Sequence, residues 1–333
     1  MQPDYAKRRR KFRKLLKPAG ANNALITDTV NVTYLTGFTG DSSYLWLASG
    51  QEVLLSDSRY AVQIAEECPG LPCEIRTAKT DLIQLTARVL KKGGSGTLAL
   101  ESHRLTKRDY DRITDAVSQM TPVPTSGLVE QLRAIKDKYE IQTIRKSIAI
   151  AERAFQVIRA QLSPEQTELQ VAHNLEHQIR AFGGTRCAFD PIVGVGPRGA
   201  LPHGTPSGRQ IGESGFTLVD WGAQFQGYSS DLTRILVTGK ISAKLRRVYE
   251  LVLRAQLAAI RQVRHGASLV KVDQAARKTI ENGGFGRRFG HGLGHGFGLQ
   301  IHESPFISPS AKGVLQSGMV VTIEPGIYLP DWG

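Results

Sequence analysis

Two aspartates in a strand-rich part of the chain are the first residues whose positions suggest chemistry. Asp220 follows the apolar run FTLV, and Asp231 begins the run DLTRILV eleven residues later. The turn-like AQFQG between them predicts a β-hairpin, which would place the two carboxylates on adjacent strands. One such aspartate could be a turn or edge residue. Two on one hairpin favour a functional role, because burying an unpaired carboxylate costs free energy.

A glycine- and histidine-rich segment follows at 289–305, with the sequence FGHGLGHGFGLQIHESP. Glycine at alternate positions makes a helix implausible, and in an extended chain the even spacing of His291 and His295 places both imidazoles on one side. The glycines also let another segment approach the backbone closely. His291, His295 and His302 are three of only eight histidines and fall within twelve residues. That clustering favours a functional site over a loop with incidental histidines.

Glu324 completes the set of candidate ligands, since it ends an apolar strand predicted in MVVTIEPGIYLP (319–330), where packing alone would not select an acid. Asp220, Asp231, His295 and Glu324 together would suit Mn²⁺, Co²⁺, Fe²⁺ or Zn²⁺. A carboxylate-rich set favours two ions about 3.5–4 Å apart, which hold a hydroxide between them and polarise a carbonyl. The implied chemistry is hydrolysis.

Two pairs of helices are predicted to position these strand regions. The first pair comprises 139–162 and a helix that opens at Thr167, with Gln170 completing a capping box. The second pair, about a hundred residues later, comprises 242–265 and a shorter helix after Ser268. Each pair ends at paired glycines and leads into a glycine-rich, strand-like region. An internal duplication would produce this order, but paired glycines alone are a poor repeat signal, and two unrelated helix pairs fit it equally well.

The first part of the chain alternates predicted strands and helices, which indicates an α/β domain. Strand-like runs occupy 24–36, 45–56 and 98–100, helices are predicted at 80–92 and 106–119, and TPVPTSG (121–127) is the predicted linker. This part carries no phosphate-binding or nucleophile motif, so we assign no chemistry to it.

Composition narrows the class of protein. A chain of 333 residues suggests two domains, and no apolar run approaches the length of a membrane span. Three cysteines cannot form a disulfide framework, which fits a cytoplasmic protein. The N-terminus lacks the apolar core of a signal peptide. The basic run KRRRKFRKLLK (7–17) could bind nucleic acid, but we expect a solvated helix face with Phe12, Leu15 and Leu16 packed inward.

Several motifs in order resemble a known family. DWGAQFQGYSSDLTRI, GHGLGHGFGLQIHE and VVTIEPGIY are similar to the proline-specific branch of the dinuclear metallopeptidases, which holds Xaa-Pro aminopeptidase and Xaa-Pro dipeptidase (prolidase). NVTYLTGFTG with LLSDSRY resembles the family's N-terminal domain. The resemblance implies a creatinase-type α/β domain over 1–126. Over 127–333 it implies an α+β pita-bread (creatinase/aminopeptidase-like) catalytic domain with an internal pseudo-two-fold duplication.

The resemblance implies roles for the four candidate ligands. Asp220 would bind one of two divalent ions, for which we expect manganese, and Asp231 would bridge both. His295 would bind the second ion together with Glu324. Glu324 would also carry protons between the attacking hydroxide and the leaving amine. The implied activity is metal-dependent hydrolysis of peptide bonds that precede proline.

The remaining histidines are implied to serve the substrate. His203, unremarkable by itself in LPHGTP, and His302 match positions that hydrogen-bond the peptide near the scissile bond. His291 matches a histidine beside the ligands, positional rather than ligating, that also lines the substrate site. The expected partners are proline-containing peptides and further copies of the chain, as a dimer or tetramer. An aminopeptidase and a dipeptidase both fit, because loops that close the cleft decide between them.

One ligand of the family is missing from this sequence. The fifth ligand is a second bridging glutamate in a segment beyond EPGIY, and the sequence ends at Gly333 before it. We therefore expect a partial sequence of a peptidase. The alternative is a non-catalytic pita-bread binding module or pseudoenzyme.

Overall fold

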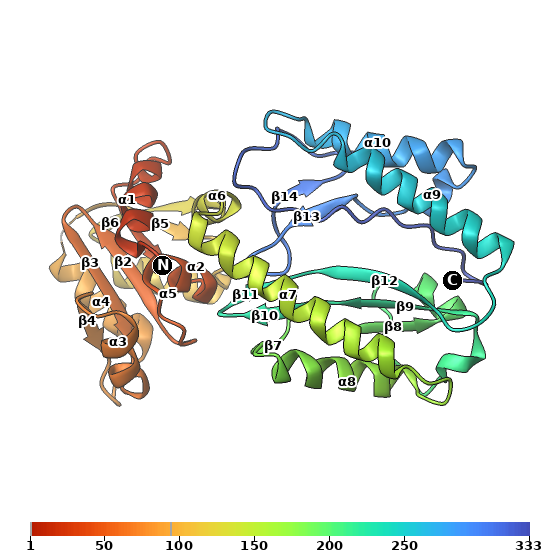
Figure 1. The fold of residues 1–333 in the computed structure, drawn as a ribbon. Coiled ribbons are helices and arrows are strands. Elements are labelled where there is room, and N and C mark those ends of the chain that lie inside the picture. The colour runs from red at the N-terminus through yellow and green to blue at the C-terminus, as the bar shows by residue number, and fades with distance from the viewer. Residues whose placement is uncertain (1, 94) are drawn as a thin grey trace. The chain divides into compact units, whose positions relative to one another are not determined.

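A computed structural model of the chain describes residues 2–93 and 95–333 (Figure 1). The chain divides into two units, Met1–Arg133 and Ala134–Gly333. The division falls near the end of helix α6 (Leu128–Ala134), whereas the predicted boundary follows residue 126.

The first unit is built on a six-stranded mixed sheet in the order β4-β3-β2-β1-β5-β6. Its strands are β1 (Asn23–Ile26), β2 (Tyr44–Ala48), β3 (Gln51–Ser56), β4 (Cys73–Ile75), β5 (Gly96–Glu101) and β6 (Met120–Thr125). Its other helices are α1 (Tyr5–Leu16), α2 (Thr29–Thr36), η1 (Ser58–Tyr60), α3 (Ala61–Glu67), α4 (Leu82–Lys92) and α5 (Lys107–Ala116). Strand β1 pairs antiparallel with β2 and parallel with β5. The alternation of strands and helices confirms the α/β class.

The run 24–36 was predicted as strand-like throughout, and its second half is a helix instead. Strand β1 ends at Ile26, and α2 follows after two residues. The side chain of Asp28 accepts a hydrogen bond from the amide of Asn31, and Gly37 ends the helix in the left-handed conformation. These two caps outweigh the β-branched composition of the run.

The predicted linker TPVPTSG is also wrong, because most of it forms β6. This strand pairs with β5 at the edge of the sheet, with Pro122 and Pro124 inside the ladder. Proline has no N–H to donate, and an edge strand has one side on which no donor is required. The prolines therefore mark an edge strand here rather than a connection.

The single strand-like run predicted over 45–56 is instead two antiparallel strands, β2 and β3, joined by a turn at Ser49 and Gly50. The remaining predicted elements of this unit are confirmed. Helices α4 and α5 and strand β5 lie within or around the predicted ranges, and a capping box at Asp81 opens α4. Gly93 ends α4, and Gly94, the second glycine of the predicted stop, lies outside the described residues.

The basic run at 7–17 forms α1, with Phe12 and Leu16 buried and Leu15 half-buried, as expected for a helix that packs one face inward. Arg9 and Arg13 each contact Glu52 at 2.5 Å. These two cations therefore serve the packing of the helix.

The second unit combines two helix pairs with short strands. Its helices are α7 (Lys138–Gln161), α8 (Glu168–Ala181), η2 (Gly196–Ala200), η3 (Ile211–Glu213), α9 (Ala243–Ile260), α10 (Leu269–Asn282) and η4 (Gly286–Arg288). Its strands are β7 (Arg186–Cys187), β8 (Ile192–Val195), β9 (Phe216–Trp221), β10 (Ala223–Phe225), β11 (Tyr228–Ser229), β12 (Leu232–Val237), β13 (Gly294–Gly296) and β14 (Glu303–Ile307). They pair as β12-β9-β8, β11-β10-β7 and β13-β14. Within this unit, α8 lies on one side of the strands and α9 with α10 on the other (Figure 1).

The helix pairs α7–α8 and α9–α10 occupy the predicted places. The predicted capping box between Thr167 and Gln170 opens α8, and the side chain of Ser242 caps α9. Helix α9 ends at Ile260, earlier than the predicted 265. Its end tightens into a turn in which the amide of Val263 bonds the carbonyl of Ile260, a common way to satisfy the last carbonyls of a helix.

The core of this unit holds β9 in place. Val219 and Trp221 are fully buried, Trp221 stacks on Phe155 of α7 with ring centroids 4.3 Å apart, and its Nε1 donates to the carbonyl of Ala151 at 3.0 Å. Alternate residues of a strand face opposite sides. Asp220 therefore faces away from the helices.

Composition predicts neither a disulfide framework nor a membrane span. Cys68, Cys73 and Cys187 are free thiols. Over the described ranges, no helix is both long and apolar enough to cross a bilayer.

The packing of α8 yields a stability test. Leu175 is fully buried, whereas Leu169 on the same helix is 40% exposed. We expect Leu175→Ala to lower the free energy of unfolding by about 2–5 kcal/mol, because it leaves a cavity, and Leu169→Ala to change it by about 0.5 kcal/mol or less. Urea unfolding followed by tryptophan fluorescence measures both. If both variants lost the same free energy of unfolding, the result would contradict this placement of α8.

Candidate metal centre

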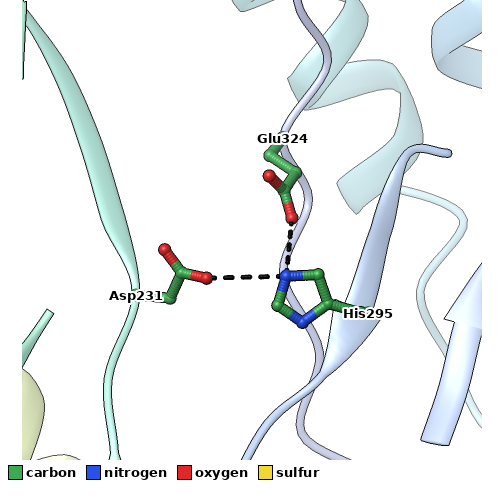
Figure 2. A group of neighbouring side chains, drawn as sticks. All are labelled: Asp231, His295 and Glu324. Atoms are coloured by element: carbon green, nitrogen blue, oxygen red, sulfur yellow. Dashed lines mark ion pairs between the residues drawn. The ribbon is translucent and has the colours of Figure 1, made fainter. Parts of the chain in front are cut away.

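The side chains of Asp231, His295 and Glu324 converge from three separate segments (Figure 2). Nε2 of His295 lies 3.2 Å from Oε1 of Glu324 and 3.6 Å from Oδ2 of Asp231. Their ligand atoms all lie within 4.8 Å of one another. Asp231 immediately precedes β12, His295 is in β13, and Glu324 is in the extended chain that follows β14. The fold thus brings together three of the four predicted ligands.

Asp220, the fourth predicted ligand, lies on β9 opposite Thr233 of β12, close to Asp231 along the ladder. The predicted pairing of the two segments is confirmed, although a smaller hairpin, β10–β11, connects them. Oδ1 of Asp220 is buried and has no hydrogen-bond partner. A buried oxygen without a partner is costly, and a cation is the partner that a carboxylate would take. This set of donors therefore fits a divalent metal.

The two aspartates bind protons unusually strongly. Burial, reinforced by the charges of Asp231 and Glu324, raises the pKa of Asp220 to about 7, against a hydrogen bond from Thr233 and the charge of His295. Burial and the charge of Glu324 raise the pKa of Asp231 to about 6, with His295 opposing them. A bound cation would reverse both shifts by favouring the ionised carboxylates.

His295 and Glu324 stabilise each other's charged forms. Burial lowers the pKa of His295, but the hydrogen bond to Glu324 and the carbonyl of Gly296 raise it above its ordinary value. Burial alone would raise the pKa of Glu324, but hydrogen bonds from His295 and Thr322 hold it below the usual range.

The orientation of the His295 ring suits a metal ligand. Nδ1 lies 3.0 Å from the carbonyl oxygen of Gly296. Because a carbonyl only accepts hydrogen bonds, Nδ1 carries a proton, and Nε2 faces the two carboxylates. A histidine that donates its other N–H to a backbone carbonyl has the arrangement common among metal ligands.

Glycines bring the chain that carries Glu324 against β13. A Cβ atom at Gly294 would lie 2.2 Å from the carbonyl oxygen of Thr322, and one at Gly296 would lie 2.4 Å from that of Ser304. The amide of Glu324 donates to the carbonyl of Leu293 at 2.9 Å. These contacts confirm that the alternating glycines allow close backbone approach.

Two predicted extended segments are shorter than expected. Among the described residues of 319–330, a single bridge between Gly296 and Val321 replaces the predicted strand. A register shift between His295 and Gly296 interrupts the ladder, and Pro325 has no N–H to continue it. Within the glycine-rich segment, Gly294–Gly296 forms the short strand β13, and β14 begins near the end of the segment, at Glu303.

The other predicted site histidines differ in their surroundings. The ring of His302 meets that of His295 edge-on, with centroids 4.4 Å apart. Burial lowers the pKa of His302, and the charges of His295 and His203 add to this effect. His203 itself is exposed, in the chain between η2 and η3.

Both ring nitrogens of His291 have partners in the structure. Nδ1 lies 2.7 Å from the carbonyl of Gly292, and Nε2 lies 2.9 Å from the hydroxyl of Tyr328. Arg277, paired with the fully buried Asp273, donates to the carbonyl of His291 at 2.8 Å. These bonds are what a positional residue would make.

Two neighbours of the centre were not identified from the sequence. The hydroxyl of Thr322 donates to Oε1 of Glu324 at 2.6 Å. A signal for Thr322 existed, because residues two apart in extended chain share a side. Tyr328 contacts His291, and burial with the charge of Glu324 raises the pKa of its hydroxyl to about 12. No sequence signal pointed to Tyr328.

The raised pKa of Asp220 predicts how the metal-free protein responds to pH. The group titrates near 7 in the folded state and at 3.8 ordinarily, so the folded state binds more protons between these values. Stability therefore falls as the pH rises through this window. Asp220→Asn removes the charge, and we expect it to raise the stability of the metal-free protein at pH 7.5 by on the order of 1–3 kcal/mol.

Thermal unfolding in a chelating buffer from pH 5 to pH 8 measures this effect. The matched control is Asp190→Asn, at an exposed position of the same unit. A variant Asp220→Asn that loses stability with rising pH as steeply as the wild type would contradict the assignment.

Known proteins resemble this chain over most of its length. Residues 142–333 match metallopeptidase family M24, and residues 8–135 match the creatinase/prolidase N-terminal domain. A Xaa-Pro dipeptidase of Pyrococcus furiosus is 32% identical over 328 residues, which cover 97% of this chain and 91% of that protein. The structure of a Xaa-Pro dipeptidase from Bacillus anthracis matches with a TM-score of 0.95 at 35% identity, over 99% of this chain and 92% of that one. That of an X-Pro aminopeptidase from Thermotoga maritima has a TM-score of 0.88 at 34% identity, over 96% and 91% of the two chains.

These likenesses confirm the resemblance and the fold expected from it, a creatinase-type α/β domain followed by a pita-bread catalytic domain. The family works with divalent metal ions, which agrees with the donor set described above. The chain belongs to metallopeptidase family M24 and is an enzyme, a metallo-exopeptidase.

Proposed function

We propose that this enzyme hydrolyses the peptide bond that precedes proline in Xaa-Pro substrates. The observation that carries the proposal is the convergence of Asp231, His295 and Glu324 beside the partnerless carboxylate oxygen of Asp220. Similar proteins named Xaa-Pro dipeptidase and X-Pro aminopeptidase support the choice of substrate.

Four residues of the centre would hold a pair of divalent ions. Asp220 would bind one ion, Asp231 would bridge both, and Nε2 of His295 with Glu324 would bind the second. Three carboxylates and one imidazole suit Mn²⁺, Co²⁺, Fe²⁺ or Zn²⁺. When bound, the ions would supply an activated water and polarise the scissile carbonyl.

Glu324 would move the proton in the reaction. The hydrogen bond from Thr322 favours the ionised form of its carboxylate, which can therefore accept a proton from the attacking water. As the C–N bond breaks, Glu324 would pass this proton to the leaving prolyl nitrogen, and the other product is the freed carboxylate. Thr322 would fix the carboxylate's orientation through its bond to Oε1.

Three histidines would serve the peptide substrate. The lowered pKa of His302 favours its neutral form at pH 7, in which one ring nitrogen donates and the other accepts. It can therefore bind either polar group of a peptide unit. His203 would contact the peptide from its exposed loop. His291 would contribute by holding Tyr328, with which it shares a hydrogen bond.

A non-catalytic binding module on the same fold is the weaker candidate. Such a module has no use for acids that burial, together with the charge of neighbouring acids, makes costly to ionise, as the raised pKa of both Asp220 and Asp231 indicates. Binding a cation would offset that cost. Manganese as the ion, a dimer or tetramer and a cytoplasmic location remain predictions.

We expect the full-length protein, loaded with Mn²⁺, to cleave Ala-Pro dipeptides or Ala-Pro-Ala tripeptides, and to leave Ala-Ala intact. The ratio of kcat/KM for the two proline substrates distinguishes a dipeptidase from an aminopeptidase. Because Asp231→Asn removes the charge and one oxygen of a ligand, and His295→Ala removes a ligand outright, we expect either to lower kcat/KM by at least about 10³-fold. A chelator should abolish the activity, and added Mn²⁺ should restore it.

Calorimetric titration with Mn²⁺ provides a second measurement, which does not depend on turnover. Asp231→Asn and His295→Ala should bind less metal or bind it more weakly, whereas the exposed-site control Asp190→Asn should match the wild type in both assays. Full activity of His295→Ala, or undiminished Mn²⁺ binding by Asp231→Asn, would refute the proposed centre.

A further inference from the structure

The first residue of α8 carries a carboxylate with no exposure to solvent. Glu168 is 0% exposed. Its Oε1 accepts from the amide of Val195 at 2.9 Å, and its Oε2 accepts from the amide and hydroxyl of Ser207 at 2.8 and 2.7 Å. Nε of Arg198 lies 3.0 and 2.9 Å from the two oxygens. A single buried carboxylate therefore receives donors from three residues of one chain segment.

These donors surround a loop that carries His203. We define the His203 loop as residues 196–206, which lie between Val195 at the end of β8 and Ser207. Glu168 holds both flanking residues of the loop, and it holds Arg198 within it. Arg198 also donates to the carbonyl of Thr205 on the far side of His203. The loop is thus closed at its base and braced across its middle.

Backbone amides at the start of α8 in turn donate hydrogen bonds to the chain that follows the loop. The amide of Glu168 donates to the carbonyl of Arg209 at 3.0 Å, and that of Leu169 donates to the carbonyl of Ser207 at 3.1 Å. The first amides of a helix have no partners within it, so the chain after the loop satisfies them. A negative side chain at this end of a helix is also favourable.

Stability alone does not account for this arrangement. A buried ion pair contributes little net stability, because the desolvation of both groups offsets their attraction. Such a pair does impose one geometry, since any other arrangement leaves a charge buried without partners. The geometry imposed here is that of a loop whose central histidine is exposed.

We propose that Glu168 is a positioning residue, which orders the His203 loop so that His203 meets the substrate. This inference rests on the proposed function, in which His203 contacts the peptide. Glu168 acts through the loop and does not touch the substrate. Loss of its charge would release the loop and leave the metal ligands unchanged.

The test uses Glu168→Gln, which keeps the shape of the side chain but replaces one accepting oxygen with an NH₂ group and removes the charge. We expect kcat/KM for an Ala-Pro substrate to fall roughly 10²-fold, the size of effect that a misplacement of about 1 Å causes. Because both changes remove the same contact, Glu168→Gln combined with His203→Ala should be no worse than His203→Ala alone. Mn²⁺ binding should equal that of the wild type.

Hydrogen–deuterium exchange reports on the loop without any turnover. In Glu168→Gln we expect the amides of residues 195–207 to exchange at least about 10-fold faster, with the rest of the unit unchanged. The matched control is Glu176→Gln on the same helix, where Glu176 makes an exposed pair with Arg180. It should match the wild type in every assay. Should Glu168→Gln fail to fold, Ser207→Ala keeps the charge of Glu168 and removes two hydrogen bonds, the one from the Ser207 hydroxyl to Glu168 and the one it accepts from the amide of Arg209. It should show a smaller effect of the same kind.

Each outcome supports or overturns the inference. Wild-type kcat/KM in Glu168→Gln, or a double variant that shows the full product of the two single losses, would overturn it. If the wild type cleaves no Xaa-Pro substrate, the proposed function fails. Exchange then still decides whether Glu168 orders the loop: faster exchange confined to 195–207 supports that role, and unchanged exchange refutes it.

Discussion

The catalytic unit has to hold acids close together against their own repulsion. Burial and the charges of Asp231 and Glu324 raise the pKa of Asp220, and burial and the charge of Glu324 raise that of Asp231. His295 is the basic group in contact with Asp231 and Glu324. Such an arrangement is unfavourable without a cation and favourable with one. The metal-free site therefore has to be maintained by the packing of the surrounding structure, and the rest of the unit is organised to provide this.

That support comes from segments with no freedom to move apart. Asp220 lies on β9 between two fully buried residues, Val219 and Trp221, which pack against α7 and α8. On the other side of the centre, Gly294 and Gly296 let two backbones meet at distances that no other residue would allow. Packing on both sides therefore places the ligands of the centre before any ion is bound, as binding or catalysis with little reorganisation requires.

Buried ion pairs recur beside the histidines of this unit. In each pair the acid or the cation also makes a hydrogen bond with the backbone near a histidine. The pairs are Glu168–Arg198 near His203, Asp273–Arg277 near His291, and Lys136–Glu303 near His302. Pairs of this kind add little stability but exclude other geometries. Their placement indicates that the unit uses buried charge to fix the chain around these three histidines.

Local sequence signals were sufficient for much of this protein. Caps and periodicity located α4, α5, α7, α8 and α10, because a cap and an apolar stripe are properties of a few neighbouring residues. The four candidate ligands were identified because an acid at the end of an apolar run, or a histidine among alternating glycines, is unusual within its own segment. The same local approach misplaced 24–36, 121–127 and 319–330. In 121–127 and 319–330 the outcome depended on a sheet edge or on a bulge in a neighbouring strand. In 24–36 the caps at Asp28 and Gly37 were local signals, but the prediction followed the β-branched composition instead.

The sequence by itself determined which residue types were available to bind a cation and which segments carried them. Only the tertiary structure decided that Asp231, His295 and Glu324 meet, that Nε2 of His295 faces the carboxylates, and that Tyr328 and Glu168 support the histidines. The physical reason is that these contacts join segments far apart in the chain. Their geometry follows from the packing of strands and helices on one another, which no single segment encodes.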